Sequence, residues 1–534
     1  MTRALFATLA LPAMLAAQQP DLPVLADRVF DPWNSTHTPG CAVGVARGGT
    51  ILLTRGYGMA DLETGTPITP ETIFESGSVA KQFTATATVL LALDGKLDLD
   101  DPVRKYIPEL PDYGRPVTIR HLLTHTSGLR EWSALVAVQG WSRGSRRHTQ
   151  DVLFDAVTRQ RSLNYPVGDY YSYTNSGYGL LFTIVERVSG LPFEQVFERR
   201  IFGPLGMTHT RWRDDFTQLV PGRAQAYARE RDGWHLEMPF EDVVGPGGLL
   251  TTVGDWLIWN EALTNRTLGA ALVDSLGRRM RLTGGREIEY ALGLFFTTYR
   301  GVPEISHGGA TAGYRTFLAR YPDRGNLSIA VLCNGANANP AAYAHALADA
   351  LIDDFPPAVT LDTTAVDSAA LAHAAGVYRN DRWGTALVVT PNMAAQFRAL
   401  PNGWLWTPGG AISHVEPGTG GRPAGLRVAQ ADGDTLTFTF VSDRVWQPTA
   451  RDLAALEGRY RSDELDVTYQ VKALGDTLTM TPRAGLVERL RPTYPDGFEG
   501  AGTAVWFSRD RSGRVTAMHF GQSRLWDLAL ARLR

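Results

Sequence analysis

The stretch FESGSVAKQF, residues 74–83, places Ser78 three positions before Lys81. One helical turn brings two such side chains to the same face. A serine hydroxyl is a weak nucleophile at its ordinary pKa, and a desolvated lysine with a lowered pKa can accept its proton. The pair therefore predicts nucleophilic acyl chemistry, with a helix-capping serine beside a half-buried lysine as the alternative.

A second stretch, YYSYTNSGYG at residues 170–179, contains Tyr173 and Asn175. Two residues at this spacing on a tight loop can point into one cleft. A phenol beside an amine can carry a proton, and an amide can hold a substrate carbonyl while contacting the lysine. The alternative is an aromatic surface loop.

A third stretch, ISHGGATAGYRTFLARYP at residues 305–322, contains His307, Gly308 and Gly309. Paired glycines allow a substrate to approach the backbone closely. The N–H of Ala310 would then join that of Ser78 in an oxyanion hole. An ordinary glycine-rich turn is the alternative.

The elements around these residues indicate one mixed domain. From Ser78 to about Gly95 the pattern is helical and apolar on nearly all sides, which predicts a helix buried at the centre, with Ser78 at its N-terminus. Strand-like runs occur at 39–59 and 313–333, and helical patches lie between them. This order predicts an antiparallel sheet completed by both ends of the domain and flanked by helices.

The rest of the chain changes in texture. After a linker at 357–369 come short alternating runs separated by turn residues, which predict an all-β region. A weak repeat aligns Gly376 with Gly458 and Tyr378 with Tyr460. We expect two barrel-like domains at 370–450 and 451–534, with one larger barrel as the alternative.

Taken in order, S-x-x-K, Y-x-N and H-x-G resemble the three motifs of the serine β-lactamase and penicillin-binding-protein superfamily. The closest similarity is to its class C β-lactamase-like branch of D-aminopeptidases, D-alanyl-D-alanine carboxypeptidases and esterases. Segments such as LDLDDPVRKYIPELP and TIRHLLTHTSGL also look like that family, and the resemblance covers about 39–350. It implies an α+β fold, with a β-lactamase-like domain at 18–356 followed by the β-barrel-type region.

The resemblance also implies roles for the residues. An acyl-enzyme forms on Ser78, and Lys81 and Tyr173 form the proton-relay pair, with the identity of the base left open. The remaining residues of the three motifs bind substrate or line the oxyanion hole: Asn175, His307, Gly308, Gly309 and Ala310. No metal or organic cofactor is implied.

His307 departs from true β-lactamases, whose third-motif lysine helps to bind the substrate carboxylate. A neutral histidine does so less well, so we expect poor antibiotic hydrolysis. The H-G-G form together with the β-rich tail favours a D-aminopeptidase-like hydrolase of small amides, D-residue peptides or esters. The alternatives are a promiscuous carboxylesterase or weak β-lactamase and, outside enzymes, an acylated sensor or an inactive binding scaffold.

Net charge and the N-terminal segment bear on which partners and which cellular compartment to expect. The formal net charge is −3 and basic runs are absent, which argues against nucleic-acid binding. Residues 1–17 read as a secretory signal, so we expect a periplasmic or secreted protein with no further membrane span. The partner is a small-molecule or short-peptide substrate, with cell-wall peptides as candidates, and the oligomeric state is not predicted.

Two further patterns concern a pair of histidines and the two cysteines. His121 and His125 have a metal-ligand spacing but lack the glutamate and third ligand of a zinc site. Cys41 and Cys333 lie in strand-like runs that could neighbour each other in one sheet. We expect two buried free thiols, with a disulfide as the alternative.

Overall fold

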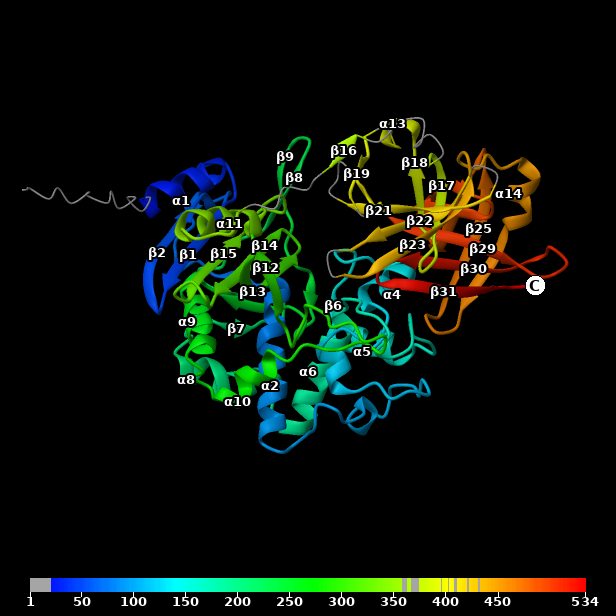
Figure 1. The fold of residues 1–534 in the computed structure, drawn as a ribbon. Helices are drawn as coiled ribbons and strands as arrows, with labels where there is room; N and C mark the ends of the chain where they lie inside the picture. Colours follow the sequence, from blue (N-terminus) through cyan, green and yellow to red (C-terminus); the bar gives the residue numbers. More distant parts are fainter. Residues whose placement is uncertain are drawn as a thin grey trace, which may run out of the picture.

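The computed structural model describes residues 21–357, 363–365, 374–394, 396–401, 403–407, 411–419, 422–430 and 433–534. The expected signal segment and most of the expected linker lie outside these residues. Figure 1 shows a domain of helices and sheets with a β-rich region beside it. This is the α+β architecture with an all-β tail that the sequence predicts, and the boundaries proposed within the chain stay predictions.

A six-stranded antiparallel sheet organises the first domain. Its order is β12-β13-β14-β15-β1-β2, so strands from the two ends of the domain are neighbours, as expected. The strands are β1 (Cys41–Arg47), β2 (Thr50–Tyr57), β12 (Phe295–Tyr299), β13 (Val302–Thr311), β14 (Tyr314–Tyr321) and β15 (Leu327–Cys333).

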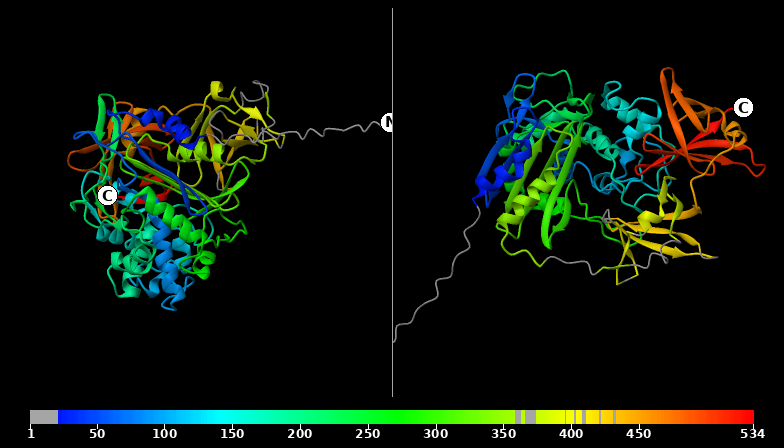
Figure 2. Two further views of the ribbon diagram at one scale, coloured as in Figure 1. Left: turned by 90° about the vertical axis from the view of Figure 1, so that its left-hand side faces the viewer. Right: turned by 90° about the horizontal axis from the view of Figure 1, so that it is seen from above.

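Helices cover both faces of this sheet (Figures 1 and 2). α1 (Leu22–Phe30) and α11 (Pro340–Leu351) share one buried apolar cluster with β1, β14 and β15. α9 (Val253–Thr264) packs on the other face, where a Cβ at Gly44 would lie 3.1 Å from Leu257. The missing side chain at Gly44 therefore lets this helix approach the sheet closely.

The central helix, α2 (Ala80–Leu93), has twelve buried residues, as its all-round apolar pattern predicts. A short 3₁₀ turn, Gly77–Val79, precedes it, and Gly95 follows with a φ of +72°. α2 packs on α6 (Asn175–Ser189) and α10 (Ala270–Leu276).

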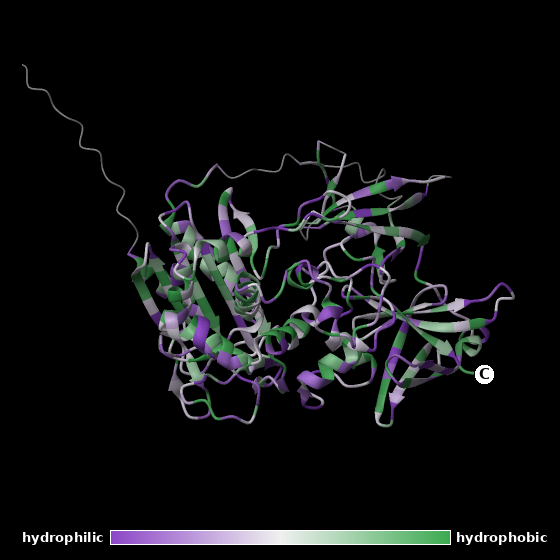
Figure 3. Cartoon of the chain, turned by 90° about the horizontal axis from the view of Figure 1, so that it is seen from below, coloured by the Kyte–Doolittle hydropathy of each residue, from purple (hydrophilic) through white to green (hydrophobic). Residues whose placement is uncertain are grey.

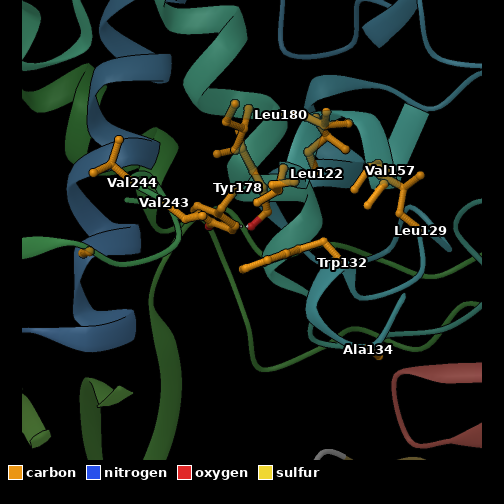
Figure 4. Packing of buried hydrophobic residues seen from close by; sticks show 14 of the residues in the cluster. Leu122, Leu129, Trp132, Ala134, Val157, Tyr178, Leu180, Val243 and Val244 are labelled. Atoms are coloured by element: carbon orange, nitrogen blue, oxygen red, sulfur yellow. Dashed lines mark hydrogen bonds between the residues drawn. The ribbon is translucent and has the colours of Figure 1, made fainter. Parts of the chain in front are cut away.

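The remaining helices of this domain are α3 (Ile119–Leu123), α4 (Trp132–Val138), α5 (Gln150–Thr158), α7 (Phe193–Phe197), a π-turn (Glu198–Phe202) and α8 (Gly203–Leu205). Figure 4 shows the apolar packing between α3, α4 and α6, with Leu122, Trp132 and Tyr178 among its members.

Small sheets complete the domain. β5 (Phe74–Glu75) leads directly into the turn that carries Ser78, and it pairs with β11 (Leu249–Thr251), which also pairs with β7 (Arg211–Trp212). The other short strands are β3 (Met59–Asp61), β4 (Thr66–Pro67), β6 (His148–Thr149), β8 (Tyr227–Glu230), β9 (Gly233–Leu236) and β10 (Glu241–Asp242).

The two cysteines form a disulfide, which corrects the expectation of free thiols. β1 pairs with β15 in the register that places Cys41 directly opposite Cys333, and their Cα atoms are 4.0 Å apart. The sequence indicated two strands that could be neighbours, but it did not fix their register. The bond links residues 292 positions apart and ties the first strand of the domain to the last.

Within the described residues, the tail contains a closed barrel and an eight-stranded sheet. The barrel consists of β24 (Gly458–Ser462), β25 (Val467–Leu474), β26 (Thr477–Arg483), β27 (Leu486–Tyr494), β28 (Gly497–Gly500), β29 (Thr503–Arg509), β30 (Val515–Gln522) and β31 (Leu525–Arg532). The sheet before it has the order β16-β19-β20-β21-β22-β23-β17-β18, and α14 (Ala450–Leu456) connects it to the barrel.

The strands of that sheet are β16 (Thr364–Ala365), β17 (Gly376–Asn380), β18 (Ala386–Val389), β19 (Arg398–Ala399), β20 (Leu405–Trp406), β21 (Ile412–Pro417), β22 (Pro423–Ala429) and β23 (Thr435–Ser442), with α13 (Pro391–Ala394) after β18. Its order gives it two edges, β16 and β18, among the described residues.

The weak sequence repeat has a structural counterpart. β17 and β24 begin with Gly376 and Gly458, whose φ angles are +155° and +152°. The hydroxyls of Tyr378 and Tyr460 each donate a 2.7 Å hydrogen bond to the carbonyl four residues earlier. The same local geometry thus opens a strand in each part of the tail.

The barrel packs against the first domain at α4. The Tyr469 hydroxyl donates to the Val138 carbonyl at 2.7 Å, and Arg130 pairs with Glu464 at 3.2 Å. A single cluster of buried apolar residues extends from the central helices into the barrel interior. Hydrophobic residues line the main sheet and alternate with hydrophilic ones along the barrel strands (Figure 3). Within the described residues, every helix is too short or too polar to cross a bilayer.

Candidate active site

Ser78 and Lys81 lie at the start of the buried central helix. Lys81 Nζ is 3.1 Å from Ser78 Oγ, 2.8 Å from Asn175 Oδ1 and 2.7 Å from the Pro246 carbonyl oxygen. The first two motifs predicted from sequence therefore meet at one lysine, which is fully buried.

Burial lowers the Lys81 pKa well below its usual 10.5, and the nearby Glu131 carboxylate opposes this shift only in part. The contacts also fix the arrangement around Nζ. Asn175 Oδ1 and the Pro246 carbonyl can only accept, so Nζ donates to both, and an ammonium donates to Ser78 Oγ as well. In the free amine, which the lowered pKa favours, the third position would hold the lone pair, and Lys81 could then take the Ser78 proton.

Tyr173 lies beside this pair. The Tyr173 hydroxyl is buried and makes no hydrogen bond of standard geometry with any described residue. It lies near the Ser78 hydroxyl, whose proximity by itself would lower the Tyr173 pKa. Burial outweighs that effect and raises the Tyr173 pKa above the usual value for tyrosine. Lys81 Nζ lies 4.9 Å from the centre of the Tyr173 ring. Tyr173 is thus a neutral phenol at the reacting centre.

Asn175 is the first residue of α6, and Thr174 caps the helix. The buried carboxylate of Glu131 accepts hydrogen bonds from the Asn175 backbone N–H at 2.6 Å, Asn175 Nδ2 at 3.2 Å and Thr174 Oγ1 at 3.0 Å. A carboxylate requires donors, so Glu131 fixes the side-chain amide with its oxygen toward Lys81. No sequence motif marks Glu131, although the charged pair Arg130 and Glu131 in the segment SGLREWSALV is a visible signal.

The third motif lies on β13. β12 pairs only with Val302–Ser306 of β13, so the following residues have a free edge on that side. The turn that carries Ser78 packs there: a Cβ on Gly77 would lie 2.6 Å from the backbone nitrogen of Ala310. This places the backbone nitrogen of Ala310 beside the turn that carries Ser78, and both residues line one cavity, as an oxyanion hole requires.

The two glycines of the motif differ. A Cβ on Gly309 would lie 2.1 Å from the Ser76 carbonyl oxygen, whereas one on Gly308 would meet nothing closer than 3.8 Å. We expected both glycines to admit a substrate. At Gly309 the close approach is made by the chain itself, because β13 must lie against the nucleophile turn.

His307 is buried and neutral. Burial lowers its pKa to about 3. Nδ1 is 2.6 Å from the Gly308 carbonyl oxygen and must carry the proton, so Nε2 accepts from the Tyr290 hydroxyl at 3.2 Å. Both ring nitrogens are thus engaged within the protein.

Two cavities meet at Ser78. The larger, of about 730 Å³, is lined by Tyr173, His307, Ala310 and Arg524 of the barrel among others. The smaller, of about 40 Å³, lies toward Trp132 and the paired Arg143 and Glu241. Arg524 and the Pro246 carbonyl could not be predicted, since no sequence motif marks either.

The two histidines with metal-ligand spacing each accept a backbone N–H, and the His125 ring lies beside Tyr173, with ring centres 4.2 Å apart. The His121 Nδ1 atom accepts the Thr118 N–H in a helix cap, and the buried His125 Nδ1 accepts the Thr174 N–H. In the described part of the chain, one group of three potential ligands lies close together, Glu230, Asp232 and His235, and all three are exposed.

Comparisons with known proteins give one family. The model of the Beta-lactamase family matches residues 25–354. The chain is 29% identical over 315 residues to penicillin-binding protein 4* of Bacillus subtilis, covering 55% of this chain and 68% of that protein. It is 27% identical over 493 residues to a D-aminopeptidase of Cereibacter sphaeroides, covering 88% of this chain and 89% of the relative.

The similarity in fold extends into the tail. An octameric penicillin-binding protein homologue from Pyrococcus abyssi aligns with a TM-score of 0.54 at 22% identity, covering 96% of this chain and 99% of that one. The predicted resemblance to this superfamily and the prediction of a hydrolase of amide or related bonds are confirmed: the chain belongs to the Beta-lactamase family.

Proposed function

We propose that the chain is a secreted serine hydrolase that forms an acyl-enzyme on Ser78 and cleaves small amides or peptides containing a D-residue. The observation that carries this proposal is the buried Lys81 side chain, whose Nζ lies 3.1 Å from Ser78 Oγ and whose pKa is lowered by burial. The D-aminopeptidase relatives, which match most of the chain, support the substrate class.

In the proposed reaction Lys81 is the base of acylation. Its lowered pKa supplies a free amine, whereas the raised pKa of Tyr173 keeps that phenol protonated. Ser78 Oγ bonds to the substrate carbonyl carbon as its proton passes to Lys81 Nζ. The N–H groups of Ser78 and Ala310 hold the oxyanion that forms.

The carbon–nitrogen bond then breaks. Tyr173 gives its proton to the departing amine and regains one from the Lys81 ammonium, which restores the free amine. A water molecule attacks the acyl-enzyme, Lys81 takes up one of its protons, and the acid leaves as Ser78 regains its proton. No step calls on a metal or an organic cofactor.

Turnover of three chromogenic substrates by the native protein and Ser78→Ala tests this proposal. The substrates are a D-alanine anilide, p-nitrophenyl butyrate and a chromogenic cephalosporin. We expect hydrolysis of the anilide that Ser78→Ala abolishes, with an acyl adduct on the Ser78 peptide by mass spectrometry after rapid quenching. A native protein that is labelled once at Ser78 and releases no product would instead be a sensor.

A carboxylesterase is the second candidate, because the free Lys81 amine would activate Ser78 toward esters equally well. Preference for the butyrate ester would select it. Secretion rests on residues 1–17, and the amino-terminal sequence of the protein recovered outside the cytoplasm tests it. Substrates derived from cell-wall peptides remain part of the proposal, as the partner class consistent with that compartment.

A further inference from the structure

A hairpin of the C-terminal barrel reaches the cleft. Arg524 lies in the turn between β30 and β31, and its carbonyl accepts the Glu131 N–H at 3.2 Å and Asn164 Nδ2 at 3.1 Å. Trp526, two residues on, donates its N–H to Asn164 Oδ1 at 3.0 Å and packs on Tyr165 with ring centres 4.8 Å apart. The backbone of the turn is therefore fixed on the catalytic domain.

The Arg524 side chain projects over the reacting centre. Its guanidinium carbon lies 5.0 Å from the centre of the Tyr173 ring, and the residue lines the 730 Å³ cavity that contains Ser78. The side chain is exposed, and its guanidinium makes no hydrogen bond or ion pair with any residue that the structure describes. Its donors are thus free for a ligand.

The charges around this cavity have one sign. Three arginines line it and, of the described residues that do so, none is acidic. Arg143 is bound to both oxygens of Glu241, and Arg315 donates to the carbonyls of Ala312 and Tyr314 at 2.7 Å each. Arg524 differs from both, because its guanidinium has no hydrogen-bond partner among the described residues and lies over Tyr173, and a guanidinium matches a carboxylate with two parallel hydrogen bonds.

The position of Arg524 indicates which part of the substrate it would contact. It stacks on Tyr173, to which the proposed function gives the protonation of the leaving group. His307 cannot take this anion, because it is neutral and both of its nitrogens are engaged. We propose that Arg524 determines specificity by binding a carboxylate on the leaving-group portion of the substrate, so that peptides with a free carboxyl terminus are preferred. This inference rests on the proposed function.

The test measures competition with ester hydrolysis. p-Nitrophenyl acetate is the reporter, and the competitors are acetyl-D-alanyl-D-alanine and its carboxyl-terminal amide, which differ in one charge. We expect the free acid to inhibit the native full-length protein about 10- to 100-fold more strongly than the amide, because a charge-assisted pair is lost in the amide. Added salt should reduce this ratio.

Three variants locate the effect. Arg524→Ala should bring the ratio close to one while ester turnover continues, and Arg524→Lys should retain part of it. Arg514→Ala is the matched control, since Arg514 is an exposed arginine of the preceding barrel turn that pairs with Asp510. Equal inhibition by acid and amide in the native protein, or an unchanged ratio in Arg524→Ala, would overturn the inference while leaving the hydrolase intact. Ester hydrolysis that is absent, or that survives Ser78→Ala, would instead refute the proposed function and the inference with it.

Discussion

Replacing Glu131 by glutamine should impair the active site without touching any residue of the three motifs. The Glu131 side chain is buried and accepts four hydrogen bonds, two at each carboxylate oxygen. Oε2 accepts the backbone N–H of Asn175 and the Thr174 hydroxyl, whereas Oε1 accepts Asn175 Nδ2 and the Ser133 hydroxyl. A glutamine amide must place its NH₂ group at one of these two positions.

The glutamine orientation of lower free energy puts the NH₂ group at the position of Oε1. At Oε2 it would face a backbone N–H, which cannot rotate away, whereas the Ser133 hydroxyl at Oε1 can turn to accept. The cost then falls on Asn175, whose own NH₂ group faces the new one. If Asn175 flips, Lys81 loses its 2.8 Å acceptor; if it does not, a buried donor is unpaired.

One such loss costs about 1–2 kcal/mol, which corresponds to a fall in acylation rate of about 5- to 30-fold. The pH dependence of kcat/KM in Glu131→Gln provides a second test. Glu131 raises the Lys81 pKa, so its neutralisation lowers that pKa further and the acid limb of kcat/KM moves to lower pH. Both quantities come from ester turnover measured across a pH series.

Glu304→Gln is the matched control. Glu304 is also buried and accepts from Ser306, Tyr321 and His345, so its replacement should lower the unfolding temperature. It does not contact Asn175 or Lys81, and the acid limb should stay in place. A Glu131→Gln protein whose rate and acid limb both match the native protein would refute the relay from Glu131 through Asn175 to Lys81.

Three further predictions concern the frame of the site. Gly309→Ala should abolish turnover or folding, because its Cβ would lie 2.1 Å from the Ser76 carbonyl oxygen. Gly308→Ala should keep a folded, active protein, since its Cβ would meet nothing closer than 3.8 Å. Equal behaviour of the two variants in turnover and thermal unfolding would contradict the placement of β13. Reducing the Cys41–Cys333 bond should lower the free energy of unfolding by about 2–4 kcal/mol, and titration of the denatured, unreduced protein should find no reactive thiol. The His307 pKa of about 3 lies below its unfolded value of 6.5, so stability is lost as the pH falls from 6.5 toward 3, by at most about 5 kcal/mol. His307→Asn should therefore show a smaller drop in unfolding temperature between pH 7 and pH 4.5, and an equal drop would show that His307 titrates normally.

The chemistry-bearing residues could be read from the sequence because each lies at a local structural boundary. Ser78 precedes a buried helix, Asn175 begins another helix, and His307 comes directly before a glycine pair on a strand. These are short-range signals, and three motifs in a fixed order made them specific. Register and protonation were not readable, because they depend on pairing and burial across the whole domain. The disulfide is the clearest case, since a shift of one residue in the β1–β15 pairing would separate Cys41 from Cys333.

Contributions from the tail were hidden for a different reason. Alternating strands predict a barrel but not which turn of the barrel meets another domain, and Arg524 occupies a turn with no unusual composition.

The packing of the barrel on the first domain bears on how the tail should be tested. The buried apolar cluster is continuous from α4 into the barrel, so removing residues 357–534 would uncover part of the catalytic domain's core and confound substrate range with stability. A single substitution at Arg524 leaves that interface in place, because the contacts that fix the turn are made by its backbone and by Trp526. The point variant can therefore separate a role in specificity from a role in holding the two domains together.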